Sequence, residues 1–163
     1  MPTKFTLAQV RFFLNASIKD ESQEQSPTLL NRLLGYKIPL DLRYRLEVLQ
    51  RQLESMMKPV EVEIRDLYAA FQAAVPEKEK NEDAEPDAEE DAAAATAKAD
   101  AEKKFKADIE EIDNRPVEFT GKLILATQLV DPKMPPDADA FLSIPGIMRD
   151  WLAPFTIDNL PEK

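Results

Sequence analysis

The sequence predicts a mainly α-helical fold: an antiparallel hairpin of two long helices, with a short N-terminal helix and a small β element plus a terminal helix at its base. Two observations predict the hairpin. Apolar residues recur at steps of three and four through residues 38–75, the spacing that places them on one helix face. Residues 91–113 are rich in Ala, Lys and Glu and contain no Gly or Pro, which favours a return helix. The apolar stripe consists of Leu42, Leu46, Leu49, Leu53, Met56, Val60, Ile64, Leu67, Phe71 and Val75.

The composition indicates one domain with a modest core. The chain has 163 residues, and 44% of them are hydrophobic. It has no Cys and no His, which excludes disulfides, thiolate metal sites and the commonest general base. No run of 18 apolar residues occurs, so we expect no membrane contact. We expect one domain over residues 1–163, made of N-terminal helices (1–36), the long helix (38–75), an acidic connector (76–90), the return helix (91–113) and a small β/helix cap (114–163).

The net charge of −10 is concentrated in the middle of the chain. Residues 1–75 hold 10 Lys and Arg against 9 Asp and Glu, residues 76–112 hold 6 against 14, and residues 113–163 hold 5 against 8. So acidic a chain does not bind nucleic acid through a general electrostatic footprint, and we expect no direct nucleic-acid partner. Mimicry of DNA would need carboxylates spread over a folded surface, whereas a solvated connector accounts for their clustering.

The N-terminal segment carries a helix-start signal. Thr6 is followed by Gln9, the capping-box pattern in which each side chain accepts a hydrogen bond from the other residue's backbone N–H, so a helix is expected over residues 5–16. After a polar loop, residues 29–34 supply one or two further helical turns. Gly35 can end them in the left-handed conformation.

Pro59 interrupts the pattern of the long helix, because it lacks the N–H that would donate to the carbonyl of Ser55 and costs about 3 kcal/mol in a helix interior. Either the helix kinks there or two helices meet. The stripe keeps its phase through Pro59, which favours a kink. From Leu42 to Val75 the stripe makes nine steps in 33 residues, closer to a straight helix than to a left-handed coiled coil.

The last third of the chain holds the strongest strand formers. Residues 117–125 form either a hairpin turning at Gly121 or one bulged strand. Residues 131–139 are expected to be a loop, because a double Pro excludes regular structure there. A short helix follows Gly146 and ends before Pro154. This helix carries Trp151, which we expect to pack against the hairpin base near three apolar residues of the return helix: Phe105, Ile109 and Ile112.

The candidate functional residues are partner contacts, and we expect no catalytic, cofactor-binding or metal-binding residue. Arg43 and Arg51 alternate with the stripe and suggest an anion patch, although a solvated helix face explains them equally well. Met56 and Met57 suggest an adaptable contact surface, although core packing is the commoner role. Trp151 is a further candidate, with a core anchor as the favoured alternative. Asp137 and Asp139 resemble half of a cation site but lack the rest of its ligands.

The order of parts resembles the small uncharacterised proteins of tailed bacteriophages and prophages that have a helical hairpin and a short C-terminal β/helix region. The matching stretches are TLLNRLLGYKIPLDLRYRLEVLQRQLE, VEVEIRDLYAAF and FKADIEEI, and the most specific piece is Ile38-Pro39 followed by Tyr44, Leu46, Leu49 and Leu53. The likeness covers most of residues 4–155, while Pro59 and the acidic segment depart from it. It carries over no functional residue.

The resemblance implies a phage-encoded protein of the host cytoplasm or the virion, with a role in particle assembly or host takeover. We predict a non-enzymatic structural or interaction protein whose hairpin docks on copies of itself or on components of the phage particle. The alternative is an acidic inhibitor or decoy that binds a basic surface of a host nucleic-acid enzyme through residues 77–91. An enzyme would have to work with carboxylates and Tyr alone.

Overall fold

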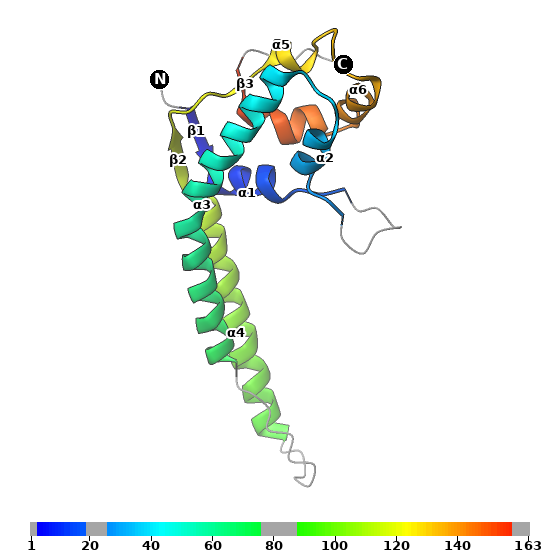
Figure 1. Cartoon of the computed structure of the whole chain (residues 1–163). Helices are drawn as coiled ribbons and strands as arrows, with labels where there is room; N and C mark the ends of the chain where they lie inside the picture. Colours follow the sequence, from blue (N-terminus) through cyan, green and yellow to red (C-terminus); the bar gives the residue numbers. More distant parts are fainter. Residues whose placement is uncertain (1–2, 19–25, 76–87, 158–163) are drawn as a thin grey trace. The chain divides into compact units, whose positions relative to one another are not determined.

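The computed structural model describes residues 3–18, 26–75 and 88–157, and it is mainly helical, as predicted (Figure 1). The chain forms two compact units, which we describe separately. Unit 1 comprises Met1–Met57 and Arg115–Lys163, and unit 2 comprises Lys58–Asn114. Helix α3 (Leu40–Ala74) begins in unit 1 and ends in unit 2.

The predicted N-terminal helix is confirmed as α1 (Leu7–Asn15), and its capping box is formed. The N–H of Thr6 donates to Gln9 Oε1 (2.9 Å), and the N–H of Gln9 donates to Thr6 Oγ1 (3.2 Å). Two of the N–H groups that have no partner inside a helix are thereby satisfied, because each residue of the box accepts from the other.

The second predicted helix is confirmed as α2 (Leu29–Gly35), but the role predicted for Gly35 is wrong. Of the three glycines, all within the described residues, only Gly146 has a positive φ, of 89°. Gly35 is instead the last residue of the helix. The chain leaves it through Tyr36 in an extended conformation, and the N–H of Tyr36 donates to the carbonyl of Leu33 (3.2 Å).

The strand formers of residues 117–125 make neither a hairpin nor one bulged strand, which corrects that prediction. β2 (Pro116–Phe119) pairs antiparallel with β1 (Thr3–Thr6), a strand not predicted, in the register Thr3 to Phe119. β3 (Ile124–Leu125) pairs parallel with β4 (Thr156–Ile157), also not predicted. Each half of the segment therefore finds its partner at a distant end of the chain.

Four short helical elements connect β3 to β4. They are α5 (Ala126–Leu129), α6 (Pro136–Leu142), the π-helix η1 (Ile147–Leu152) and the 3₁₀-helix η2 (Ala153–Phe155). The prediction that residues 131–139 lack regular structure is wrong, because Pro136 is the first residue of α6, a position where the missing N–H costs nothing. The last predicted helix is present as η1, which ends before Pro154 as predicted. Pro154 lies in η2, which follows η1 directly.

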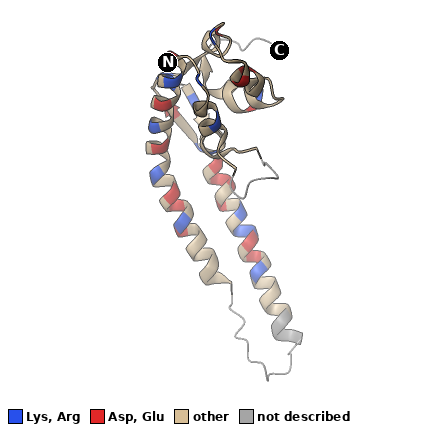
Figure 2. Cartoon of the chain, turned by 45° about the vertical axis from the view of Figure 1, so that its right-hand side comes forward, with Lys and Arg blue, Asp and Glu red and all other residues tan. Residues whose placement is uncertain are grey.

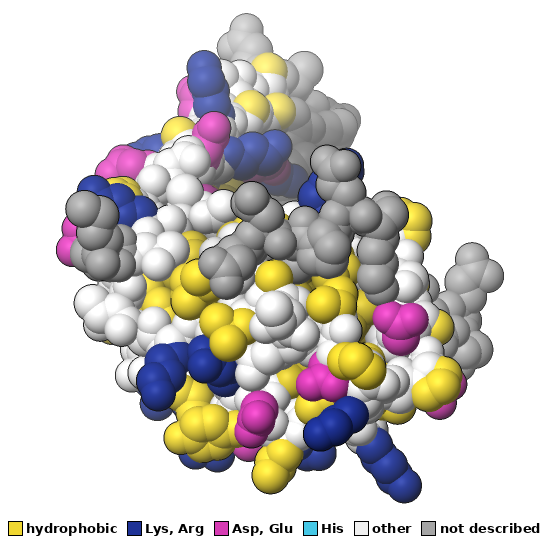
Figure 3. Space-filling view, turned by 90° about the horizontal axis from the view of Figure 1, so that it is seen from above, with side chains coloured by type: hydrophobic (Ala, Val, Ile, Leu, Met, Phe, Trp, Pro, Cys, Tyr) yellow, Lys and Arg dark blue, Asp and Glu magenta, His cyan; other side chains and the backbone are white. Residues whose placement is uncertain are grey.

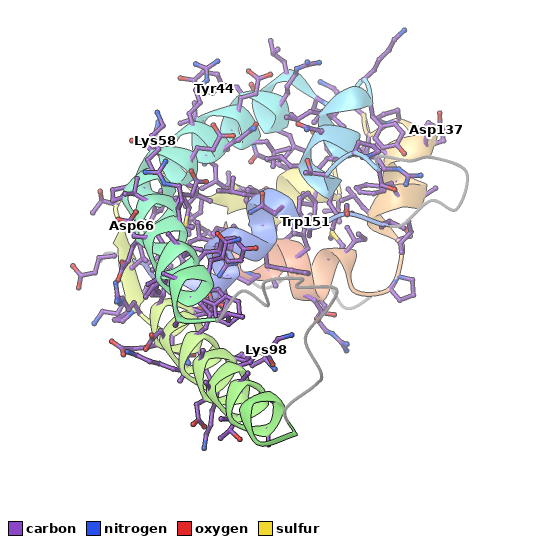
Figure 4. All side chains as sticks on the ribbon, turned by 90° about the horizontal axis from the view of Figure 1, so that it is seen from below. Tyr44, Lys58, Asp66, Lys98, Asp137 and Trp151 are labelled. Atoms are coloured by element: carbon purple, nitrogen blue, oxygen red, sulfur yellow. The ribbon has the colours of Figure 1, made fainter. Side chains whose placement is uncertain are left out.

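The core of unit 1 is built around Trp151, whose predicted burial is confirmed at 1% exposure (Figure 4). The indole stacks on Phe13 of α1 with 5.3 Å between ring centroids, and Phe13 packs on Phe155 at 4.5 Å. The indole Nε1–H donates to the carbonyl of Phe13 (3.0 Å). Phe13 of α1, which was not predicted as a partner, therefore supplies the ring that stacks on the indole.

Unit 2 contains the rest of α3 and helix α4 (Ala88–Asp113), so both predicted long helices are confirmed. Pro59 lies inside α3 without ending it, which excludes two separate helices at that point. Most of the predicted acidic connector, residues 76–87, lies outside the described residues. No helix in the described part of the chain is both long and apolar enough to cross a membrane.

Candidate interaction surface

The four leucines of the apolar stripe are completely covered in unit 1, whereas the stripe is only partly covered in unit 2. Leu42, Leu46, Leu49 and Leu53 are 0% exposed, and Met57 is 3% exposed. Beyond Met57 the stripe continues at the same spacing as Val60, Ile64, Leu67, Phe71 and Val75, and every one of these side chains is half-buried. The helical pattern is unchanged across this boundary, so the difference lies in what packs against it.

Helix α4 supplies an aromatic partner for the half-buried part of the stripe. Phe105 lies 5.2 Å from Phe71 and 6.2 Å from Tyr68, centroid to centroid, and Tyr68 lies 6.3 Å from Phe71. The cluster is open to solvent, because Tyr68 remains 49% exposed. Among the described residues of unit 2, only Ile112 is buried. We use the name open seam for six apolar residues of the two helices that are half-buried or exposed: Ile64, Leu67, Tyr68, Phe71, Phe105 and Ile109.

A surface hollow on α4 adjoins the open seam. It has a volume of about 330 Å³, and Phe105 and Ile109 form its apolar part. Lys106, Glu110 and Asp113 line its charged part. An apolar floor with a charged rim is the arrangement expected for a protein contact rather than for a buried small-molecule site.

The two units differ sharply in charge. Residues 58–114 hold 8 Lys and Arg against 18 Asp and Glu, a net charge of −10, whereas unit 1 holds 13 against 13 and is neutral. The described parts of unit 2 alone, residues 58–75 and 88–114, hold 6 against 12, a net charge of −6. Figure 2 marks the positions of acidic and basic residues along both helices of this unit. Its acidity therefore does not depend on the connector alone.

The predicted contact residues lie in different environments. Arg43 is exposed, and its Nε donates to Glu47 Oε1 (3.1 Å), an i,i+4 pair worth only about 0.3–0.5 kcal/mol. Arg51 is exposed, and Met56 is half-buried. Met57 and Trp151 are buried, which favours the core role that was the alternative for each of them.

Sequence reasoning missed Tyr68 as part of the contact surface. Tyr68 lies four residues after Ile64 and three before Phe71, at the edge of the stripe, so helical spacing could have found it. Unit 1 also has exposed apolar residues: Leu40 is 78% exposed and Tyr44 is 65% exposed. On the face seen from above, hydrophobic side chains are interspersed with charged and polar ones (Figure 3). Nothing in their surroundings specifies a ligand.

The described residues show no assembled chemical site. Asp137 and Asp139 lie in the first turn of α6, where carboxylates complement the helix dipole. Among the described residues no group of three or more acidic side chains is arranged to hold a metal ion, and no polar or charged residue is buried. Arg45, on the same helix as Arg43 and Arg51, is held by a hydrogen bond from its Nη1 to the carbonyl of Leu123 (2.8 Å).

Comparison with known proteins identifies no relative. No family model, curated protein or solved structure matches this chain. Inference about function therefore rests on the open seam, its burial and its charge.

Proposed function

We propose that this chain is a non-enzymatic, phage-encoded structural or assembly protein, and that α3 and α4 of unit 2 form an antiparallel hairpin that acts as its interaction arm. The observation that carries the proposal is the incomplete burial of the open seam. A pair of helices covers only one side of each helix, so an apolar stripe shared by two helices needs a further element for complete burial. Docking supplies that element.

The chain connectivity and the aromatic contacts support the hairpin. Phe105 of α4 packs against Tyr68 and Phe71 near the end of α3, and residues 75–87 separate the two helices in the sequence. A connection of this length is sufficient for α4 to return alongside α3 as an antiparallel neighbour.

The energetic gain from docking is appreciable. Complete burial of one large apolar side chain is worth about 1.5–3 kcal/mol, so burying the part of each seam residue that is still exposed adds less than about 1 kcal/mol apiece. Together the six residues offset part of the entropy lost on association. The phage origin rests on the resemblance of the helical segments described above.

A test in phage-producing cells shows whether the open seam takes part in particle assembly or only holds the two helices together. Phe105→Ser should lower the yield of particles, because it places a hydroxyl in the open seam. Val62→Ser is the matched control, since Val62 is 46% exposed and lies about 200° around α3 from Val60. If particles form normally with Phe105→Ser and chemical cross-linking traps the chain with no particle component, an assembly role is wrong.

The charge of unit 2 favours one alternative, an acidic inhibitor or decoy of a host nucleic-acid enzyme. The carboxylates of unit 2 would bind a basic surface of the enzyme, and the net charge of −10 on residues 58–114 would attract that surface. Deleting residues 77–87 removes acidic residues without touching any described helix. An inhibitor should lose potency on this deletion, while an assembly protein should retain particle formation.

A further inference from the structure

The open seam lacks a cover that the chain provides elsewhere. In unit 1 the same stripe is closed at Leu42, Leu46, Leu49 and Leu53, all 0% exposed. Among the described residues of unit 2, those that could close it belong to α4, which offers Phe105, Ile109 and Ile112 as its large apolar residues and Ala at most other uncharged positions. Alanine is too small to cover a neighbouring aromatic ring, so the seam stays open along Ile64 to Phe71.

The shape of the open seam fits a third helix. From Val60 to Phe71 the stripe spans eleven residues, or about 16 Å along the axis, which matches two to three turns of a docked helix. A helix laid along a helical pair presents residues at steps of three and four, the same spacing as the seam. A β-strand would leave its backbone N–H and C=O groups facing side chains, without hydrogen-bond partners.

The charge of unit 2 disfavours a second copy as the occupant. Two arms whose described parts each carry a net charge of −6 would lie about 8–10 Å apart if packed as helices, about one Debye length at physiological salt, so their charges would repel. A basic helix experiences the opposite effect. Its Lys and Arg stems also cover apolar surface while their charged ends reach the acidic residues on either side.

We propose that the open seam binds a basic amphipathic helix of another protein, with the apolar face of that helix on Tyr68, Phe71 and Phe105 and its Lys and Arg residues toward the carboxylates of unit 2. This inference rests on the proposed interaction role of the arm and specifies the chemistry of its partner. Apolar contact provides the register, and charge provides the selection against acidic helices and against a second copy.

The test uses the full chain and two synthetic peptides of about 18 residues, roughly five helical turns. One peptide has Leu on one face and Lys on the other, and its matched control has Glu in place of Lys. Isothermal titration calorimetry should detect binding of the Leu–Lys peptide and none of the Leu–Glu peptide. Affinity should fall as salt is raised, because the charges are then screened.

Substitutions in the arm separate the open seam from general charge attraction. Phe71→Ser and Phe105→Ser should each weaken binding by about tenfold or more, whereas Val62→Ser should change it less than about twofold. Phe71→Leu keeps an apolar side chain and should retain binding, which distinguishes contact from loss of structure. Circular dichroism of every variant reports whether the arm keeps its helix content.

Three outcomes would overturn the inference. Equal binding by wild type, Phe71→Ser and Phe105→Ser would mean that charge alone attracts the peptide. A dimer detected by light scattering and dissociated by Phe105→Ser would make a second copy the occupant, leaving the interaction role of the arm intact. A monomer that binds neither peptide would reject the basic helix, and the particle-yield experiment would then decide independently whether the arm has an interaction role.

Discussion

Replacing Trp151 with alanine tests the packing that holds unit 1 together. Trp151 is the largest fully buried side chain among the described residues and stacks nearly parallel on Phe13, with an interplanar angle of 16°. Its Nε1–H also donates to the carbonyl of Phe13, which lies in the last turn of α1. Carbonyls in the last turn of a helix have no intrahelical donor, so the indole acts as a cap as well as a core residue.

The two roles predict two different losses of unfolding free energy. Trp151→Ala removes both the ring and the donor and should cost about 3–5 kcal/mol, the range for aromatic truncation in a core. Trp151→Phe keeps a ring beside Phe13 but leaves the carbonyl without its donor, at a cost of about 1–3 kcal/mol. For a chain of this size, the alanine variant should melt roughly 6–20 °C lower.

Urea unfolding followed by far-UV circular dichroism measures both losses, since the variants lack the only Trp. Val62→Ser is the control and should shift the unfolding free energy by less than about 0.5 kcal/mol, as expected for an exposed position. A change below about 1 kcal/mol for Trp151→Ala would refute the reasoning. So would complete quenching of wild-type Trp fluorescence by iodide, because a covered indole is not accessible to the ion.

Four further substitutions test local features by urea unfolding. Thr6→Ala removes the side chain that caps α1 and should cost about 0.5–2 kcal/mol; an unchanged midpoint would mean that the cap contributes nothing. Gly121→Ala should cost about 1–3 kcal/mol, because the added methyl meets the ring of Phe119, whereas Gly35→Ala, with nothing within 4 Å, should be neutral or stabilising; equal effects would contradict this. Arg45→Met should cost about 1 kcal/mol by removing the hydrogen bond to the carbonyl just before β3, and no loss would assign that bond no net value.

Local signals predicted the helices because their causes are local. Thr6 and Gln9 are three residues apart and form their capping box from neighbouring atoms alone. The stripe of α3 results from side-chain spacing on a single helix. It keeps its spacing through Pro59, and α3 continues past this residue although Pro59 has no backbone N–H to donate. The prediction that residues 131–139 form a loop was wrong because Pro breaks the interior of a helix but is compatible with the first turn of a helix, where Pro136 lies.

The strands could not be predicted in the same way, because their partners are distant in the sequence. β1 has four residues and pairs with β2, which begins at Pro116, while the two residues of β3 pair with β4 near the end of the chain. Segments this short carry almost no alternation to detect. The stacking of Trp151 on Phe13 could not be predicted for a related reason: the large apolar side chain indicates burial, but the connectivity of the fold decides which ring lies against it.

The open seam shows why the stripe predicted a helix but not its surface. The same three-and-four spacing leads to 0% exposure at Leu53 and to a half-buried side chain at Phe71, because burial depends on the number of elements that pack around a helix. The charges change across the same boundary, from a neutral unit 1 to a net charge of −10 in unit 2. Beyond Met57 the apolar residues of the stripe are covered only in part, even where Phe71 packs on Phe105 of α4. Their continuation for four more turns, within the only acidic unit, supports a partner that is both apolar and basic.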